Sequence, residues 1–121
     1  APVSESDDPI SAIQEAFRRY IRTDIESGHW KFGCPMNNLA QEMSPIDDGF
    51  RMRLDDLYAT WRGTYASGLE GRIDADPEQV AALVVAGQMG IWGTGKYSQD
   101  ERLMERAGEA VCNYLETVRR S

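Results

Sequence analysis

The chain has 121 residues, enough for one domain that buries roughly two thirds of its unfolded surface. Its net charge of -7 at pH 7 argues against direct binding to nucleic acid, because phosphate groups require a basic protein face. Two cysteines, Cys34 and Cys112, do not make a disulfide framework, and no signal peptide or lipidation motif follows Ala1. These features favour a cytoplasmic protein.

The polar and acidic residues 1–8 are expected to form a linker, and residues 9–121 a single domain. Asp8 and Pro9 have the pattern of a helix N-cap followed by proline at the first helical position. The apolar residues that follow are spaced three and four apart, namely Ile10, Ile13, Phe17, Tyr20, Ile21 and Ile25. This spacing predicts an amphipathic helix that ends near Gly28.

After a connector at residues 29–33, Cys34 and Pro35 repeat the pattern of cap and first helical residue. A short helix is expected, with Met36, Leu39, Ala40 and Met43 on one side. A thiol at a helix N-terminus has a lowered pKa, so Cys34 is a candidate redox sensor. The alternative is that Cys34 is a small buried residue, as is common for cysteine and as we expect for Cys112.

A long helix is predicted from Ser44 to Gly71, with Ser44 as its cap and Asp47 completing a capping box. One apolar stripe runs along it, made of Phe50, Leu54, Leu57, Tyr58, Trp61, Tyr65 and Leu69. The acidic pairs at residues 47–48 and 55–56 are interpreted as solvated surface, because adjacent helical residues face different directions.

Residues 79–95 carry no charge in a chain that is 27% charged. Asp76 and Pro77 begin this helix, and apolar residues fall on all its sides, so it must be covered all round. Spanning a membrane needs about 20 apolar residues, and this stretch is shorter and interrupted by glutamines and glycines. A small domain has few helices with which to enclose another one, so we expect a second copy of the chain to cover it.

The predicted dimer interface begins with a row of small residues, which lets another helix approach closely: Ala82, Ala86 and Gly90. Gly93 and Gly95 are expected to end this helix early. A last helix is predicted over residues 100–118, with one row facing inward and three residues beside it. The inward row is Leu103, Ala107, Val111, Tyr114 and Val118, and the residues beside it are Met104, Gly108 and Leu115. Leu103, Ala107 and Val111 are added to the predicted interface. No alternating strand pattern appears, so the predicted fold is an all-α domain of five helices.

Signals of catalysis are weak. Residues 90–97 match a phosphate-binding loop except at the last position, where Tyr97 replaces the Ser or Thr that binds magnesium. A phosphate loop joins a strand to a helix, whereas this segment follows a helical pattern, so a nucleotide-binding enzyme is the least favoured alternative. The single histidine, His29, and the lack of ligand spacing predict no catalytic residue, no metal site and no cofactor.

Three rings with polar tips share one side of the long helix, Tyr58, Trp61 and Tyr65. We expect them to line a ligand pocket between helices, together with Met36, Asn37, Gln88, Met89 and Trp92. Ordinary aromatic packing in a filled core is the alternative, which would make the chain a purely structural dimerisation domain.

Four stretches of the chain, in this order, resemble the C-terminal domain of TetR-type transcriptional regulators. They are the run GCPMNNLAQE at residues 33–42, FRMRL at 50–54, Trp61-Arg62, and Asp76-Pro77-Glu78 opening an apolar helix that contains Gln88 and Gly90. The resemblance covers most of residues 9–119. It implies an all-α homodimer in which residues 77–96 and 100–118 of both copies form a four-helix bundle.

The resemblance further implies that a small hydrophobic or aromatic effector enters the pocket and releases operator DNA. DNA binding would belong to an N-terminal helix-turn-helix domain, and no residues before Asp8 could form its three helices. The leading hypothesis is therefore a ligand-sensing and dimerisation domain of a repressor, with no catalysis and no membrane partner. The residues implied to line its pocket are those named above for the aromatic site.

Overall fold

The computed structural model describes residues 7–32 and 34–120, and the side chains of residues 29, 30, 35 and 36 lie outside that description. Most of the expected linker at residues 1–8 is therefore outside the described residues. The described residues form five α-helices and one short 3-10 helix: α1 (Pro9–Ser27), η2 (His29–Phe32), α2 (Pro35–Met43), α3 (Asp48–Leu69), α4 (Pro77–Ser98) and α5 (Glu101–Val118). The predicted all-α fold of five helices is confirmed.

Acidic caps begin three of the helices where the sequence predicts them. The carboxylate of Asp8 accepts from the backbone N–H of Ser11 at 3.1 Å, and that of Asp76 accepts from Glu78 at 2.9 Å. Asp100 accepts from the first turn of α5 in the same way. Each cap satisfies backbone donors that have no partner within the helix, which fixes where the helix begins.

The predicted start of α3 is wrong by one turn. Ser44 has helical backbone angles and donates its N–H to the carbonyl of Ala40 at 3.1 Å, so it still belongs to the end of α2. The cap of α3 is Asp47, which accepts from the N–H of Phe50 at 3.0 Å. The residue expected to complete a capping box is thus the cap itself.

The end of α4 also differs from the prediction, because the helix continues through Gly93 and Gly95 to Ser98. The hydroxyl of Thr94 donates to the carbonyl of Gly90 at 2.8 Å, and Gly95 is buried. Packing against neighbouring helices therefore outweighs the low helix propensity of glycine, about 1 kcal/mol per residue. The helix ends at Gln99, which has a left-handed backbone with φ of 54°.

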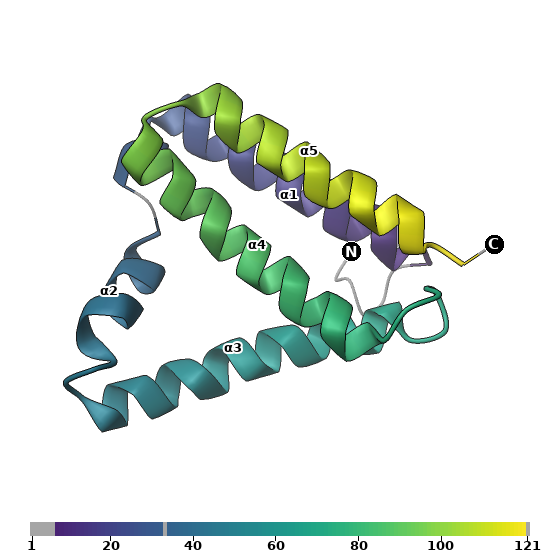
Figure 1. Cartoon of the computed structure of the whole chain (residues 1–121), viewed down its shortest axis with the longest axis horizontal. Coiled ribbons are helices and arrows are strands. Elements are labelled where there is room, and N and C mark those ends of the chain that lie inside the picture. Colours follow the sequence, from purple (N-terminus) through teal and green to yellow (C-terminus); the bar gives the residue numbers. More distant parts are fainter. Residues whose placement is uncertain (1–6, 33, 121) are drawn as a thin grey trace.

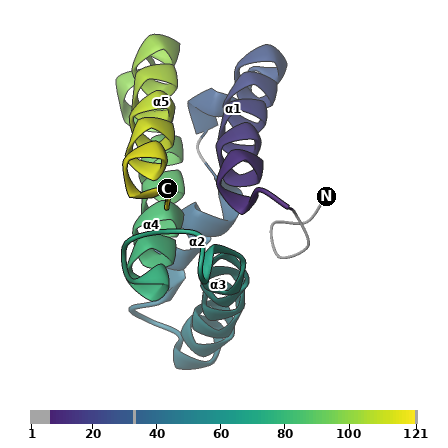
Figure 2. The same cartoon turned by 90° about the vertical axis from the view of Figure 1, so that its right-hand side faces the viewer.

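The helices form two layers. α4 and α5 lie on one side of the molecule and α1 and α3 on the other, with α1 packed along α5 and α3 packed on α4 (Figures 1 and 2). α3 and α4 are close at the loop that joins them and separate toward α2 (Figure 1). Among the described residues, no helix is long and apolar enough to cross a membrane.

The core lies between these layers and is contributed by all four long helices. Its most deeply buried large side chains are Ile10, Ile13, Leu69, Ile73, Val80, Val84, Met104, Cys112 and Leu115. Ile73 belongs to the α3–α4 loop, so the core also fixes this connection.

The inward side of α5 differs from the predicted one. Met104, Gly108, Cys112 and Leu115 are buried there. Leu103 and Tyr114, predicted to face inward, are 40% and 37% exposed, while Ala107, Val111 and Val118 are partly buried against the core. Gly108 lies against α1, where a methyl group added to it would collide with the Cδ1 of Ile21.

Candidate functional site

The three predicted aromatic residues of α3 do lie together. The rings of Tyr58 and Trp61 are stacked with centroids 6.1 Å apart, and those of Trp61 and Tyr65 are tilted with centroids 5.9 Å apart. Tyr65 is buried, whereas Tyr58 and Trp61 are half-buried against the core. The most buried of the three rings is therefore the one nearest the C-terminal end of α3, where this helix meets α4 (Figure 1).

Two polar atoms, one on α3 and one on α4, are buried without a partner among the described residues. They are the hydroxyl oxygen of Tyr58 on α3 and the side-chain carbonyl oxygen Oε1 of Gln88 on α4. Burial raises the pKa of Tyr58 above its usual value, with a smaller effect from the nearby thiol of Cys34. Most buried polar groups in proteins have a hydrogen-bond partner, so two unsatisfied atoms on adjoining helices need an explanation.

For the other predicted pocket residues the structure gives the degree of burial but few contacts. Met89 is half-buried and packs against the same core, and Gln88 is 4% exposed. Asn37 and Trp92 are half-buried. The side chain of Met36 lies outside the described residues, so its place in the pocket stays a prediction, as do those of Asn37 and Trp92.

The row of small residues on α4 is exposed in the single chain. Ala82, Ala86 and Gly90 are open to solvent, and Leu83 beside them is 53% exposed. A groove of about 350 Å³ lies between α3 and the start of α4, where Ala82 is the member of the row that lines it, and its lining is Ala59, Arg62, Gly63, Ala66, Glu78 and Ala82. On α5, Ala107 and Val111 are half-buried and Val111 would contact a methyl group added at Gly87.

Comparison with known proteins assigns the chain. Residues 9–110 match the family model of the LmrA/YxaF-like transcriptional regulator C-terminal domain, which is of the TetR type. The chain belongs to this TetR-type family.

A relative has similarity over nearly the whole of this TetR-type domain. The uncharacterized HTH-type transcriptional regulator in the lacX 3'region of Lactococcus lactis subsp. lactis is 25% identical over 119 residues. The alignment covers 96% of this chain and 60% of the relative, so the chain spans about three fifths of that regulator's length. No solved structure matches the chain.

The phosphate-loop resemblance has no structural basis in the TetR-type domain. Residues 90–97 lie entirely within α4, where backbone N–H groups are engaged in the helix and cannot surround a phosphate. The segment lies inside the helix that was expected to end before it, and the family is one of transcriptional regulators.

The two cysteines of the TetR-type domain have different surroundings. Cys112 is buried, which raises the pKa of its thiol, and its Sγ lies 3.7 Å from the carbonyl oxygen of Gln14. Cys34 is half-buried, free and at the N-cap of α2, where its side chain makes no capping hydrogen bond. The role of Cys112 as a core residue is confirmed, and the redox role of Cys34 stays a prediction.

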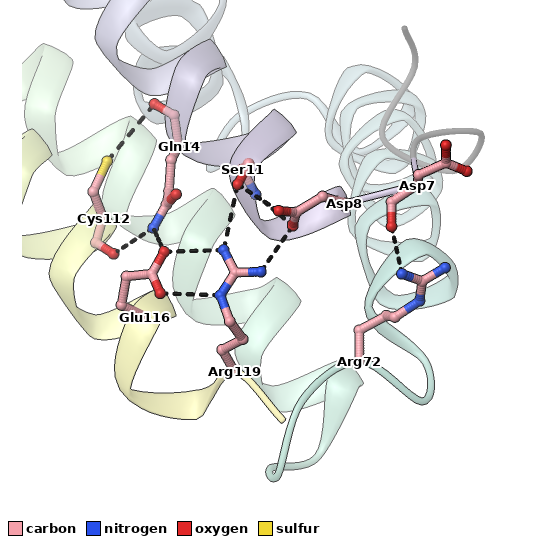
Figure 3. A network of polar contacts seen from close by, with 8 residues as sticks. All are labelled: Asp7, Asp8, Ser11, Gln14, Arg72, Cys112, Glu116 and Arg119. Carbon is pink, nitrogen blue, oxygen red and sulfur yellow. Dashed lines mark hydrogen bonds and ion pairs between the residues drawn. The ribbon is translucent and has the colours of Figure 1, made fainter. Parts of the chain in front are cut away.

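A polar network between α1 and α5 was missed in the sequence (Figure 3). The side-chain amide of Gln14 donates to the carbonyl of Cys112 at 2.9 Å and to the carboxylate of Glu116 at 3.0 Å. Arg119, which follows α5, lies 3.0 Å from Glu116 and 3.0 Å from Asp8. Its guanidinium thus pairs with two carboxylates, one of which begins α1.

The charges in this network reinforce one another. The pKa of Asp8 is lowered to about 2, chiefly by the hydroxyl and N–H of Ser11 and then by Arg119. The pKa of Arg119 is raised, mainly by Glu116. Asp8 is therefore ionised at any physiological pH. The sequence signal that could have found the network is Gln14, a polar residue on the otherwise apolar side of α1.

Proposed function

We propose that this chain is the effector-sensing and dimerisation half of a TetR-type transcriptional repressor. The observation that carries the proposal is the pair of buried polar atoms without partners, on Tyr58 of α3 and Gln88 of α4. A buried polar group left unsatisfied costs about 1–3 kcal/mol, and a ligand that bonds to it removes that cost. A filled core serving dimerisation alone would give no use for either atom.

The two atoms indicate the chemistry of the effector. The amide oxygen of Gln88 accepts a hydrogen bond, so the ligand supplies an O–H or N–H donor. The hydroxyl of Tyr58 donates, so the ligand also carries an acceptor. The stacked rings of Tyr58 and Trp61 favour a flat aromatic body. The effector class that fits is a planar, uncharged aromatic molecule with hydroxyl or amide groups.

Dimerisation is proposed through α4 and α5. Leu83 and Tyr97 on α4 are 53% and 76% exposed, and Leu103 and Tyr114 on α5 are 40% and 37% exposed. Exposed apolar side chains flanking the small residues Ala82, Ala86 and Gly90 give a surface on which the same two helices of a second copy can pack.

In this mechanism the effector acts by binding one arrangement of the dimer better than another. Operator DNA is held by an N-terminal helix-turn-helix domain of the complete regulator, since the net charge of -7 on this chain disfavours contact with phosphates. The two arrangements place the DNA-binding domains differently. The effector can shift the equilibrium between them only by as much as its affinities for the two arrangements differ.

The test uses 2-naphthol, a flat aromatic with one hydroxyl, titrated against the 121-residue chain while tryptophan fluorescence is recorded. Saturable quenching is expected, and Tyr58→Phe should weaken binding about five- to tenfold because one hydrogen bond is lost. Tyr20→Phe is the matched control, since Tyr20 is an exposed tyrosine on α1. Equal affinity in all three proteins, or no saturation, would leave the structural dimerisation domain as the better description.

A further inference from the structure

One side of α4 is exposed to solvent and uncharged over most of the length of the helix. The exposed residues on this side are Gln79, Ala82, Leu83, Ala86, Gly90 and Tyr97. At a rise of about 1.5 Å per residue, the uncharged side is about 27 Å long. Tyr97 is its most exposed large side chain. An uncharged surface of this length on a highly charged chain has the composition of a contact surface.

The two charged residues of α4 stand at opposite ends of this uncharged side. Glu78 is in the first turn and Lys96 in the last, and both are exposed. Neither takes part in an ion pair within the part of the chain that the structure describes. They are five helical turns apart, at about 3.6 residues per turn, so they lie on the same side of the helix.

This pattern of charges is complementary to itself. A two-fold axis places residue i of one copy against residue j of the other, and j against i. If the axis passes Gly87, halfway between Glu78 and Lys96, two antiparallel α4 helices place each Glu78 beside Lys96 of the second copy. The axis then lies next to Ala86, where small side chains let two helix axes approach to about 8 Å.

The same alignment brings Tyr97 to the groove between α3 and the start of α4. Tyr97 lies opposite Pro77 of the second copy, and helical side chains lean toward the N-terminus of their own helix. In an antiparallel pair this direction carries its ring to the point between Glu78 and Ala82, which both line the groove. A methyl group added at Gly63, on the α3 side of the groove, would meet no atom within 4 Å. The chain's own side chains therefore leave this space open.

The lining of the groove suits a tyrosine side chain. Ala59 and Gly63 on α3 and Ala82 on α4 are small and apolar, and they fit the flat faces of a ring. Arg62 and Glu78 also line the groove and can donate to, or accept from, a phenol hydroxyl.

We propose that the groove between α3 and α4 holds Tyr97 of a second copy, in an antiparallel pair of α4 helices aligned by two Glu78–Lys96 ion pairs. The inference rests on the dimerisation part of the proposed function and does not depend on the effector. It adds α3 to the interface and fixes the register in which the two copies meet.

Charge reversal tests the register. In sedimentation of the 121-residue chain at low salt, Glu78→Lys and Lys96→Glu should each weaken association about tenfold, because attraction becomes repulsion in both pairs. An equal mixture of the two variants should associate as tightly as the unchanged chain, since both ion pairs form again between unlike copies. Glu15→Lys, at an exposed position on α1, is the control and should have no effect.

Two further measurements identify the cause of the weakening. It should largely disappear in about 1 M salt, where the Debye length is about 3 Å. Charges that serve only the dipole of their own helix would change the free energy of unfolding and leave association unaltered, and that result overturns the register.

Filling the groove tests the place of Tyr97. Gly63→Leu should weaken association about tenfold, whereas Thr64→Leu, at an exposed neighbour outside the groove, should not. Circular dichroism should show the helices intact, because leucine has a higher helix propensity than glycine. Tyr97→Ala should weaken association to a similar extent, and Tyr20→Ala on α1 is its control.

The double variant decides whether Tyr97 and the groove meet. Once Tyr97→Ala is present, Gly63→Leu should cause almost no further loss of association, because the two substitutions remove the same contact. Independent, multiplying losses would place Tyr97 elsewhere and overturn the proposal.

The outcomes also separate this inference from the proposed function. An unchanged chain that is monomeric removes the proposed dimerisation and the inference together. A dimer that tolerates the charge reversals and Gly63→Leu keeps the proposed function and overturns the inference alone, since the two copies then meet in another register. Effector binding is judged independently by the titration with 2-naphthol.

Discussion

The hydroxyl of Tyr58 affects the free and the ligand-bound protein with opposite signs. In the free chain its oxygen is buried without a partner, which destabilises the fold. In a complex the same hydroxyl donates to the ligand and favours binding. In the proposed effector site, a group that costs stability when the site is empty would contribute to ligand affinity when the site is filled.

Tyr58→Phe should therefore stabilise the ligand-free chain. We expect the free energy of unfolding to rise by about 1 kcal/mol, because the ring remains and only the unsatisfied hydroxyl is removed. Urea unfolding followed by circular dichroism measures this, with Tyr20→Phe as the exposed control, expected to change by less than about 0.5 kcal/mol. A loss of stability in Tyr58→Phe would mean that the hydroxyl has a partner in the free protein.

Single residues were predictable from the sequence where their role depends on one helix. Tyr58, Trp61 and Tyr65 lie on one side of α3 because they are three and four residues apart, and their stacking follows from that spacing. The pairing of Gln14 with Glu116 was not predictable, because it depends on how two helices nearly a hundred residues apart are aligned.

At the scale of elements, two glycines show how closely the helices approach. A methyl group added at Gly87 of α4 would lie 3.5 Å from Val111, an ordinary contact. A methyl group added at Gly108 of α5 would collide with the terminal Cδ1 of Ile21 on α1. The same methyl group would lie 3.8 Å from the Cγ1 of Ile21. The α1–α5 interface is thus the tighter of the two at these positions.

Gly87→Ala should stabilise the domain by about 0.5–1 kcal/mol through helix propensity, whereas Gly108→Ala should not, because Ile21 must leave its rotamer. Ile21→Val removes the colliding Cδ1, so in that background Gly108→Ala should become stabilising. The check is a double-mutant cycle of thermal or urea unfolding. Equal gains from Gly108→Ala in both backgrounds would show that α1 and α5 have room for the methyl group.

Helix starts were easier to predict than helix ends. Asp8, Asp76 and Asp100 mark their helices because a capping carboxylate acts within one turn of its own residue. The extension of α4 through Gly93 and Gly95 depends on neighbouring helices, which a local signal does not report. The start of α3 was predicted one turn too early for a similar reason, because Ser44 forms the end of α2.

For the whole molecule, the exposed face of α4 sets the expected assembly. The charge-free stretch at residues 79–95 is covered by α3 and α5 on part of its circumference and leaves Ala82, Leu83, Ala86 and Gly90 open in the single chain. The fold class and the order of helices followed from the sequence. The side of α5 that faces α1 followed only in part, because contacts such as that of Ile21 with Gly108 join helices far apart in the sequence.

Ala86→Arg should convert a dimer into a folded monomer, because it places a long charged side chain where two backbones would approach closely. Sedimentation at micromolar concentration measures the association state, and circular dichroism confirms that the helices remain. Thr23→Arg, an exposed position on α1, is the control and should stay dimeric. A chain that is monomeric before any substitution would remove the proposed dimer.

The ion pair between Asp8 and Arg119, 3.0 Å long, also brings the two extremities of the folded domain together. A short flexible bridge would join them into a closed ring, and a new opening in the exposed turn at residues 45–47 would give a circular permutant with the same helices in another order. Because the two ends are close together, the domain could also be inserted into a surface loop of a host protein through two short linkers.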